Sequence, residues 1–317
     1  MNNVSELAEL HVVEGSSEMV SESIHGISRV LEVSITSTSA LVLEWRIPTQ
    51  SRYRFASIGD SGGQEELAWC ITRAKQLGAD FLLHLGDINY APGDYDSAIK
   101  LFNEAALPCY VSIGNHDFHQ DGGIYGQFLR DIGPLNNQFS IGKVRFANID
   151  TAANILPYSA GLRGKLFDQM IAETDKFSHT VAFTHRPLFD PAAEGDHDIG
   201  SIGERNWLID SYKKSGIRTV LCGHIHIYHR GEFAGLDNII VGQGLGHQDL
   251  IVADNNYSKM MLAEVTDNEF VEYDIAPLAM PMRIHCHPRT DVVKDSLRDT
   301  HRSELVEEID AACKKQS

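Results

Sequence analysis

The sequence contains few cysteines, and their arrangement is not typical of a disulfide framework or a zinc finger. Its five cysteines are odd in number and scattered singly along the chain, at positions 70, 109, 222, 286 and 313. No two of them form a CxxC pair, so neither a disulfide-stapled fold nor a zinc ribbon is indicated. Because 43% of the 317 residues are hydrophobic, the chain can form a large core without such cross-links.

Long apolar runs are also missing. No stretch approaches the ~20 apolar residues that a membrane-spanning helix requires. Residues 1–18 carry neither the basic segment nor the apolar segment that secretion signals combine. From these two observations we expect a cytoplasmic protein that has no membrane partner.

Basic residues are in deficit. The chain has 27 Lys and Arg against 44 Asp and Glu, which gives a formal net charge of −17 at pH 7. Such a chain repels nucleic-acid polymers and anionic membranes at long range, so neither is an expected partner. Phosphate chemistry stays possible, because bound metal ions reverse the sign of the field locally. Histidine, in contrast, is plentiful, with 15 residues, several of them close to Gly and Asp.

The apolar pattern divides the chain into three parts. Residues 1–50 are predicted to be an N-terminal extension, with a frayed or loosely helical segment over 1–25 and a β-hairpin over 30–45. We expect the strands of this extension to pair onto the main sheets or to cover an edge of one. Residues 51–280 are predicted to form the catalytic domain, and residues 281–317 a helical tail.

The central part alternates between strand-like and helix-like segments, which is typical of a layered α/β domain. Short apolar runs predict buried strands at 53–59, 81–86, 109–114, 180–185 and 219–223. Residues 138–150 and 260–275 have the pattern of hairpins that add further strands. Helices are predicted over 64–77, 97–106, 165–173 and 204–213.

Side chains that can bind metals follow the carboxyl ends of these predicted strands. They are Asp60, Asp87, Asn115, His116, His185, His224 and His226, and Tyr90 lies three positions after Asp87. In open α/β sheets the ligand crevice lies at that edge, so we expect these side chains to meet at one rim. Mixed oxygen and nitrogen donors suit Fe, Mn or Zn better than Ca, and no thiolate is among them.

The order of the short motifs around these residues resembles a known family. GDSG, GDINY, GNHD, VAFTH and GHIH resemble the five blocks of the metallophosphoesterase superfamily, over roughly residues 53–275. The purple acid phosphatase branch is the most similar. Gly62 stands where most of the superfamily has a histidine, and the tyrosine at Tyr90 is the compensating ligand in that branch. The resemblance implies a four-layer α/β/β/α sandwich with two mixed sheets.

The resemblance also implies how the metals are divided. One ion would be held by Asp60, Tyr90 and His226, and the other by Asn115, His185 and His224, with Asp87 bridging the two. A phenol with a pKa of ~10 loses its proton near neutrality only beside a strong Lewis acid. We therefore expect Fe(III) in the tyrosine site and divalent Fe, Zn or Mn in the other.

The chemistry implied by the family is hydrolysis by a metal-activated water, without a phosphoenzyme. His116 is expected to donate a hydrogen bond to a non-bridging phosphoryl oxygen, and Asp117 to orient His116. A general acid is needed for the leaving alkoxide, and His197 in EGDHDIG is the local candidate.

These observations predict a dinuclear-metal phosphoric ester hydrolase, and we favour a phosphomonoesterase that acts on small phosphate esters. A phosphodiesterase acting on (cyclic) nucleotides is an open alternative, because the metal ligands would be the same. Substrate choice would then depend on the loops around residues 90–96, 122–125 and 191–203. A non-catalytic binding module would be expected to lack ligands, and all seven are present. The sequence predicts no oligomeric state.

Overall fold

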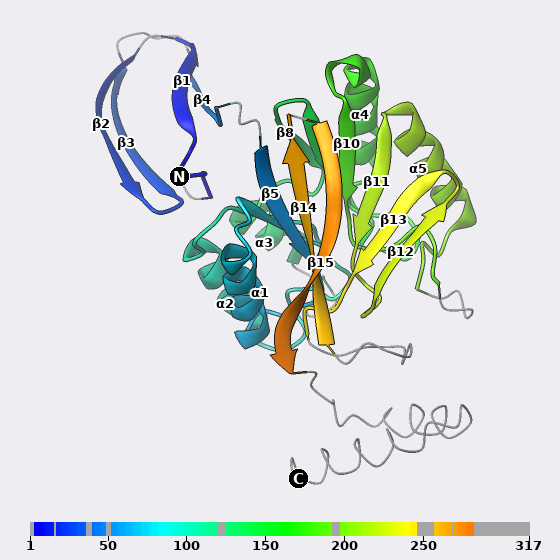
Figure 1. Ribbon diagram of the computed structural model, residues 1–317. Helices are drawn as coiled ribbons and strands as arrows, with labels where there is room; N and C mark the ends of the chain where they lie inside the picture. Colours follow the sequence, from blue (N-terminus) through cyan, green and yellow to red (C-terminus); the bar gives the residue numbers. More distant parts are fainter. Residues whose placement is uncertain are drawn as a thin grey trace, which may run out of the picture.

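The computed structural model describes residues 3–15, 17–35, 40–48, 52–118, 124–191, 197–245, 257–267 and 269–281. Two mixed β-sheets lie face to face, with helices on both outer faces (Figure 1). The predicted four-layer α/β/β/α sandwich is therefore confirmed. None of the helices within these described ranges is both long and apolar enough to cross a membrane.

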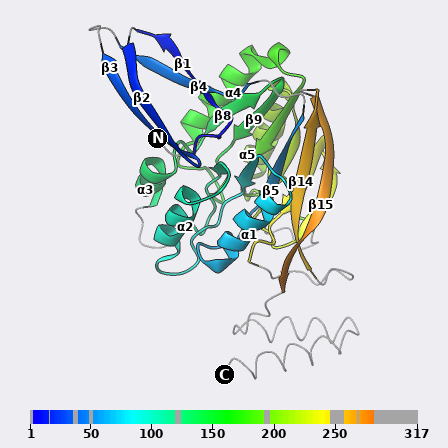
Figure 2. The ribbon, with the colours of Figure 1, turned by 60° about the vertical axis from the view of Figure 1, so that its left-hand side comes forward.

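The first sheet has five strands in the order β15-β14-β5-β6-β7. They are β5 (Arg52–Ile58), β6 (Phe81–His84), β7 (Cys109–Val111), β14 (Tyr257–Thr266) and β15 (Glu269–Pro281). β5, β6 and β7 are parallel, whereas β14 and β15 form an antiparallel hairpin beside β5. On its outer side lie α1 (Glu65–Gln76), α2 (Asp94–Asn103) and α3 (Ile124–Asp131) (Figure 2).

The second sheet has six strands in the order β12-β13-β11-β10-β9-β8. They are β8 (Asn137–Ile141), β9 (Val144–Asn148), β10 (His179–Phe183), β11 (Ile217–Cys222), β12 (Tyr228–Phe233) and β13 (Leu236–Val241). The four inner strands are parallel. The outer face carries α4 (Ala160–Ala172) and α5 (Ile202–Lys214), and a short 3₁₀ helix, Thr174–Lys176, follows α4.

Aromatic rings from both sheets fill the space between them. Phe55 and Phe81 of the first sheet stack with centroids 5.4 Å apart, and Phe146 of the second meets both edge-on at 5.2 and 5.3 Å. All three side chains are buried. Edge-to-face contacts of this kind add to the burial of the rings, so these aromatic side chains help to hold the two sheets together.

The predicted strands and helices of the central part are confirmed, with ends shifted by a few residues. The sequence analysis did not identify α3 or the β12–β13 hairpin. Charged residues interrupt β12, so it lacks the apolar run that marked the other strands. Ala234 and Gly235 form the turn between β12 and β13, and both have positive φ, as two-residue hairpins require. Gly235 is therefore the clearer sign of this hairpin in the sequence.

Two predictions for the N-terminal extension are wrong. Residues 1–25 contain β1 (Glu9–Glu14) and β2 (Ser17–His25) rather than a frayed or helical segment. Residues 30–45 are not a hairpin, because β3 (Ser28–Ile35) pairs with β2 and β4 (Val42–Arg46) pairs with β1. Gly26, at φ 58°, makes the tight turn that joins β2 to β3, and this turn sets the pairing.

The extension is also not added to the main sheets as strands. Its four strands form two separate two-stranded sheets in the described part of the chain, and they stand beside the sandwich (Figure 1). One side chain of the extension, Asn3, forms hydrogen bonds with the edge strand β7. The Asn3 amide donates to the Cys109 carbonyl at 2.8 Å and accepts from the Cys109 N–H at 2.7 Å. Thus Asn3 supplies the outer strand β7 with the two hydrogen bonds of a neighbouring strand.

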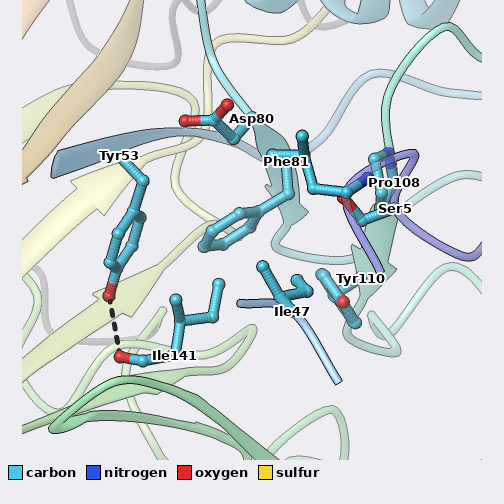
Figure 3. Close-up of a pocket in the computed structure, with 9 residues that line it drawn as sticks. Ser5, Ile47, Tyr53, Asp80, Phe81, Pro108, Tyr110 and Ile141 are labelled. Atoms are coloured by element: carbon cyan, nitrogen blue, oxygen red, sulfur yellow. Dashed lines mark hydrogen bonds between the residues drawn. The ribbon is translucent and has the colours of Figure 1, made fainter. Parts of the chain in front are cut away.

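A small apolar crevice marks the junction between the extension and the sandwich (Figure 3). Leu7 and Ile47 of the extension line it together with Tyr53, Phe81 and Tyr110. Tyr53 and Phe81 stand at the amino ends of β5 and β6, so this crevice lies at the far end of the strands from the predicted metal rim. The predicted helical tail beyond Pro281 lies outside the described residues.

Candidate active site

The first predicted ligand group comes together beyond the carboxyl ends of the parallel strands. The Tyr90 hydroxyl lies 3.2 Å from His226 Nε2 and 3.5 Å from Asp60 Oδ1. His226 Nε2 is 3.6 Å from the same Asp60 oxygen. Three side chains from distant stretches of the chain are therefore close enough to share one ion.

The second predicted group lies next to the first. Asn115 Oδ1 is 2.8 Å from His185 Nε2, and Asp87 Oδ1 is 3.4 Å from that nitrogen. Asp87, His185 and His224 each offer a ligand atom within 4.8 Å of the others. Because the other Asp87 oxygen lies 3.0 Å from the Tyr90 hydroxyl, Asp87 connects the two groups, as a bridging ligand would.

The donor set fits cations better than it fits hydrogen bonding. His185 Nδ1 lies 2.8 Å from the Leu85 carbonyl oxygen, which accepts the Nδ1 proton, so in the neutral ring Nε2 carries a lone pair. This lone pair faces the oxygens of Asn115 and Asp87, which are acceptors as well. A metal ion placed among these three acceptor atoms removes the conflict.

Burial increases the need for positive charge. Asp60 and Asp87 are 0% and 1% exposed, and burial raises the pKa of Asp60. Burial, then the Asp87 carboxylate, then the Asp60 carboxylate raise the pKa of the Tyr90 phenol. Burial also lowers the pKa of His224, with a further contribution from His185, so His224 is neutral, as a metal ligand must be.

The backbone at three of the predicted ligands adopts an unusual conformation. Asp60, Asp87 and His224 have φ values of 61°, 62° and 70°, in the left-handed region that non-glycine residues rarely occupy. Such strained residues cluster at functional sites, because the surrounding structure must compensate for their cost. Here each of them turns the chain sharply just after β5, β6 or β11.

Two glycines leave room for the ligand carboxylates. A Cβ atom at Gly114 would lie 2.1 Å from Asp87 Oδ1, and one at Gly223 would lie 2.3 Å from Asp60 Oδ2. Any larger residue would push the carboxylate away. The glycines of the GNHD and GHIH motifs are therefore required by close packing against the ligands.

The Asp117 carboxylate, which the sequence analysis expects to orient His116, contacts the backbone of two neighbouring loops. Asp117 is fully buried and accepts hydrogen bonds from the backbone N–H groups of Asp87, Ile88 and Gly114 at 3.0, 2.8 and 2.7 Å. It therefore fastens the loop after β6 to the loop after β7. The His116 ring lies against the Tyr90 ring, with centroids 4.4 Å apart.

His197 lies at the rim beside the second ligand group. Its ring centroid is 5.8 Å from that of His224, and its Nδ1 is 3.3 Å from Asp190 Oδ2. A carboxylate accepts hydrogen bonds, so Nδ1 is the donor in this pair. The sequence analysis did not identify Asp190. Asp190 lies five positions after the predicted strand 180–185, so it lacks the position directly after a strand that marked Asp60 and Asp87.

Comparisons with known proteins identify the family and the fold. A family model described as calcineurin-like phosphoesterase matches residues 53–228. The serine/threonine-protein phosphatase CPPED1 of Rattus norvegicus is 26% identical over 215 residues, which cover 60% of this chain and 68% of the rat protein.

Two solved structures share the fold. GAP50, the anchor in the inner membrane complex of Plasmodium, aligns with a TM-score of 0.53 and 16% identity over 75% of this chain and 88% of its own. The purple acid phosphatase PPD1 from yellow lupin (Lupinus luteus) seeds aligns with a TM-score of 0.52 and 17% identity. That alignment covers 72% of this chain and 54% of the lupin chain. Because the family model matches more than half of the sequence, this protein belongs to the calcineurin-like phosphoesterase family and is a metallophosphoesterase.

Proposed function

We propose that the protein is a dinuclear-metal phosphomonoesterase similar to the purple acid phosphatases. The observation that carries this proposal is the Tyr90 hydroxyl, which lies between the Asp87 carboxylate at 3.0 Å, His226 Nε2 at 3.2 Å and the Asp60 carboxylate at 3.5 Å. A phenol held between two carboxylates is placed to bind a strong Lewis acid such as a ferric ion as its phenolate. Fe(III) beside divalent Fe, Zn or Mn is accordingly the proposed pair.

Asp60, Tyr90 and His226 would hold one ion, and Asn115, His185 and His224 the other, with Asp87 shared. When bound, the pair supplies a nucleophilic water at neutral pH and positive charge for the phosphoryl oxygens. The protein's own side chains bind and orient the ester around it. His116 faces the same space and would donate a hydrogen bond to a non-bridging oxygen.

A proton for the leaving alkoxide would come from His197. The Asp190 carboxylate lies 3.3 Å from His197 Nδ1, which directs the other ring nitrogen away from Asp190. With 43% of its side chain exposed, His197 can exchange protons with solvent between turnovers. This pairing supports the assignment of His197 as the general acid.

The rat relative is named a serine/threonine-protein phosphatase, and phosphoserine and phosphothreonine are monoesters. This name favours monoesters over diesters as substrates of the present chain. The experiment that tests this preference compares a monoester and a diester of the same leaving alcohol on protein purified without chelator. We expect the monoester to have at least a tenfold higher kcat/KM; a higher value for the diester would overturn the monoesterase proposal.

Metal identity is tested on the same preparation by elemental analysis and a visible spectrum. A ferric–phenolate pair absorbs visible light, so we expect a charge-transfer band that disappears in Tyr90→Phe. The metal content of the variant, measured alongside, shows whether iron is still present. A colourless and fully active protein that holds only zinc or manganese would contradict the ferric assignment.

A further inference from the structure

The loop of residues 149–159, which we call the rim loop, follows β9 and is tied to the active site. The Arg186 backbone N–H donates to Thr151 Oγ1 at 2.8 Å, and Arg186 Nε donates to the Ala152 carbonyl at 3.0 Å. The same guanidinium lies 2.7 Å from His224 Nε2. One side chain therefore connects the rim loop to a predicted metal ligand.

The rim loop is also packed closely against the segment that carries His197. A Cβ atom placed on Gly200 would lie 2.5 Å from the Asn154 carbonyl oxygen, so the two backbones are in direct contact. The loop is thus fixed on two sides, by Arg186 and by the segment around Gly200. A position fixed in this way beside a catalytic rim suits substrate recognition.

Three aromatic rings run in a row from the GNHD motif to the rim loop. Phe118, which directly follows Asp117, stacks on Tyr125 of α3 with centroids 5.4 Å apart. Tyr125 in turn stacks on Tyr158 of the rim loop, with centroids 4.8 Å apart and ring planes 27° from parallel. The Tyr125 ring is therefore held between Phe118 and Tyr158.

The outer end of this row is exposed and apolar. Tyr158 is 73% exposed, although Tyr125 covers one face of its ring, so the other face is open to solvent. Ile155 and Leu156, earlier on the same loop, are 70% and 65% exposed. Single exposed apolar side chains are ordinary, but three within four residues, on a loop tied to Arg186, form a surface suited to binding an apolar group.

We propose that the open face of Tyr158, supported by Tyr125, is a subsite for an aromatic leaving group of the phosphate ester. The inference rests on the proposed function, since it needs the phosphoryl group to be held at the metal pair. A flat ring on the ester stacks on an open tyrosine face in the same way that Tyr125 stacks on the closed one. Ile155 and Leu156 add exposed apolar side chains on the same loop.

The test uses benzyl phosphate and ethyl phosphate on the metal-loaded protein, because both release a simple alcohol and only one carries a ring. We expect Tyr158→Ala to lower kcat/KM for benzyl phosphate by roughly 3- to 10-fold, through KM, and to change ethyl phosphate by less than about twofold. Titration calorimetry with benzylphosphonate and ethylphosphonate, which are not hydrolysed, gives the same comparison without turnover.

Two further variants serve as controls. Tyr158→Phe retains the ring and is expected to behave as the wild type. Trp69→Ala removes an aromatic side chain on α1 that is 39% exposed, and is expected to change neither ester. Equal losses for both esters, or no loss for either, would overturn the subsite. If the loaded wild type hydrolyses neither ester, the proposed function fails, and the phosphonate titrations still decide whether Tyr158 binds the ring.

Discussion

The Arg186 guanidinium lies 2.7 Å from His224 Nε2, which puts a fixed positive charge beside a predicted metal ligand. Arg186 is only 5% exposed, and its hydrogen bond to the Ala152 carbonyl holds the side chain in place. A charge held here attracts the phosphate dianion in addition to the metals.

Replacing Arg186 by Met should therefore weaken the binding of phosphate. We expect KM for a small monoester and the inhibition constant of inorganic phosphate to rise together by roughly 10- to 100-fold, the worth of one charge-assisted hydrogen bond. Steady-state kinetics with phosphate as inhibitor measures both. For Arg186→Lys, which retains the charge, we expect both constants to lie between those of the wild type and Arg186→Met. Unchanged constants in Arg186→Met would exclude a role of Arg186 in phosphate binding.

The pair of Asp190 and His197 predicts how the rate depends on the leaving group. His197→Ala should lower kcat for an alkyl phosphate by roughly 100-fold, but much less for p-nitrophenyl phosphate, whose leaving group needs no proton. Asp190→Asn removes the acceptor for Nδ1 and should have a smaller effect in the same direction, roughly tenfold. Equal losses on the two substrates would indicate that His197 does not act as an acid.

Gly114→Ala tests whether close packing holds the metal ligands. The added methyl group would meet Asp87 Oδ1 at 2.1 Å, so the carboxylate must move or the loop must shift. We expect less than half of the wild-type metal content after dialysis, measured by elemental analysis. Gly126→Ala on α3, where an added Cβ meets nothing within 4 Å, is the matched control and should retain full metal content.

His84 predicts a dependence of stability on pH in the metal-free protein. It is fully buried, with Nε2 2.8 Å from Ser61 Oγ, and burial lowers its pKa from 6.5 to about 3. Below pH 6.5 His84 binds a proton in the unfolded chain, whereas in the folded chain it stays neutral. The contribution of His84 to the free energy of unfolding, up to about 5 kcal/mol, is fully present above pH 6.5. It is lost as the pH falls towards 3.

Urea unfolding of the metal-free protein at several pH values between 7 and 4 measures this loss. His84→Gln retains a polar partner for Ser61 but cannot titrate, so its unfolding free energy should fall less steeply with decreasing pH. His25→Gln, at an exposed position at the end of β2, should have the same slope as the wild type. Parallel curves for His84→Gln and the wild type would contradict this account.

Local patterns predicted a layered α/β domain with polar side chains at one rim, whereas the four-layer sandwich and the division of the ligands followed from the resemblance to the metallophosphoesterases. Buried parallel strands are apolar runs that end abruptly, and Asp60, Asp87 and His224 follow such ends directly. The contacts between loops could not be predicted from one sequence. Nothing in the letters around Asp190 shows that it meets His197, or that residues 149–159 return to Tyr125, since these contacts depend on how distant loops are folded.

In the N-terminal extension, local patterns indicated strands but not which strands pair. Its strands carry enough β-branched residues to be recognised in part, but the choice of partner was wrong. Pairing there depends on the turn at Gly26 and on the contact of β1 with β4 across about 30 residues, whereas apolar alternation marks a strand without naming its neighbour.

The contact between Asn3 and Cys109 has a consequence for association between molecules. The unpaired N–H and C=O groups of an exposed edge strand can pair with a strand of another molecule, and repeated pairing of this kind leads to aggregates or fibrils. In this protein the side-chain amide of Asn3 occupies the N–H and the carbonyl of Cys109, which such pairing would use. Replacing Asn3 by Ala would remove both hydrogen bonds and leave a site where aggregation can begin, without touching the predicted metal ligands.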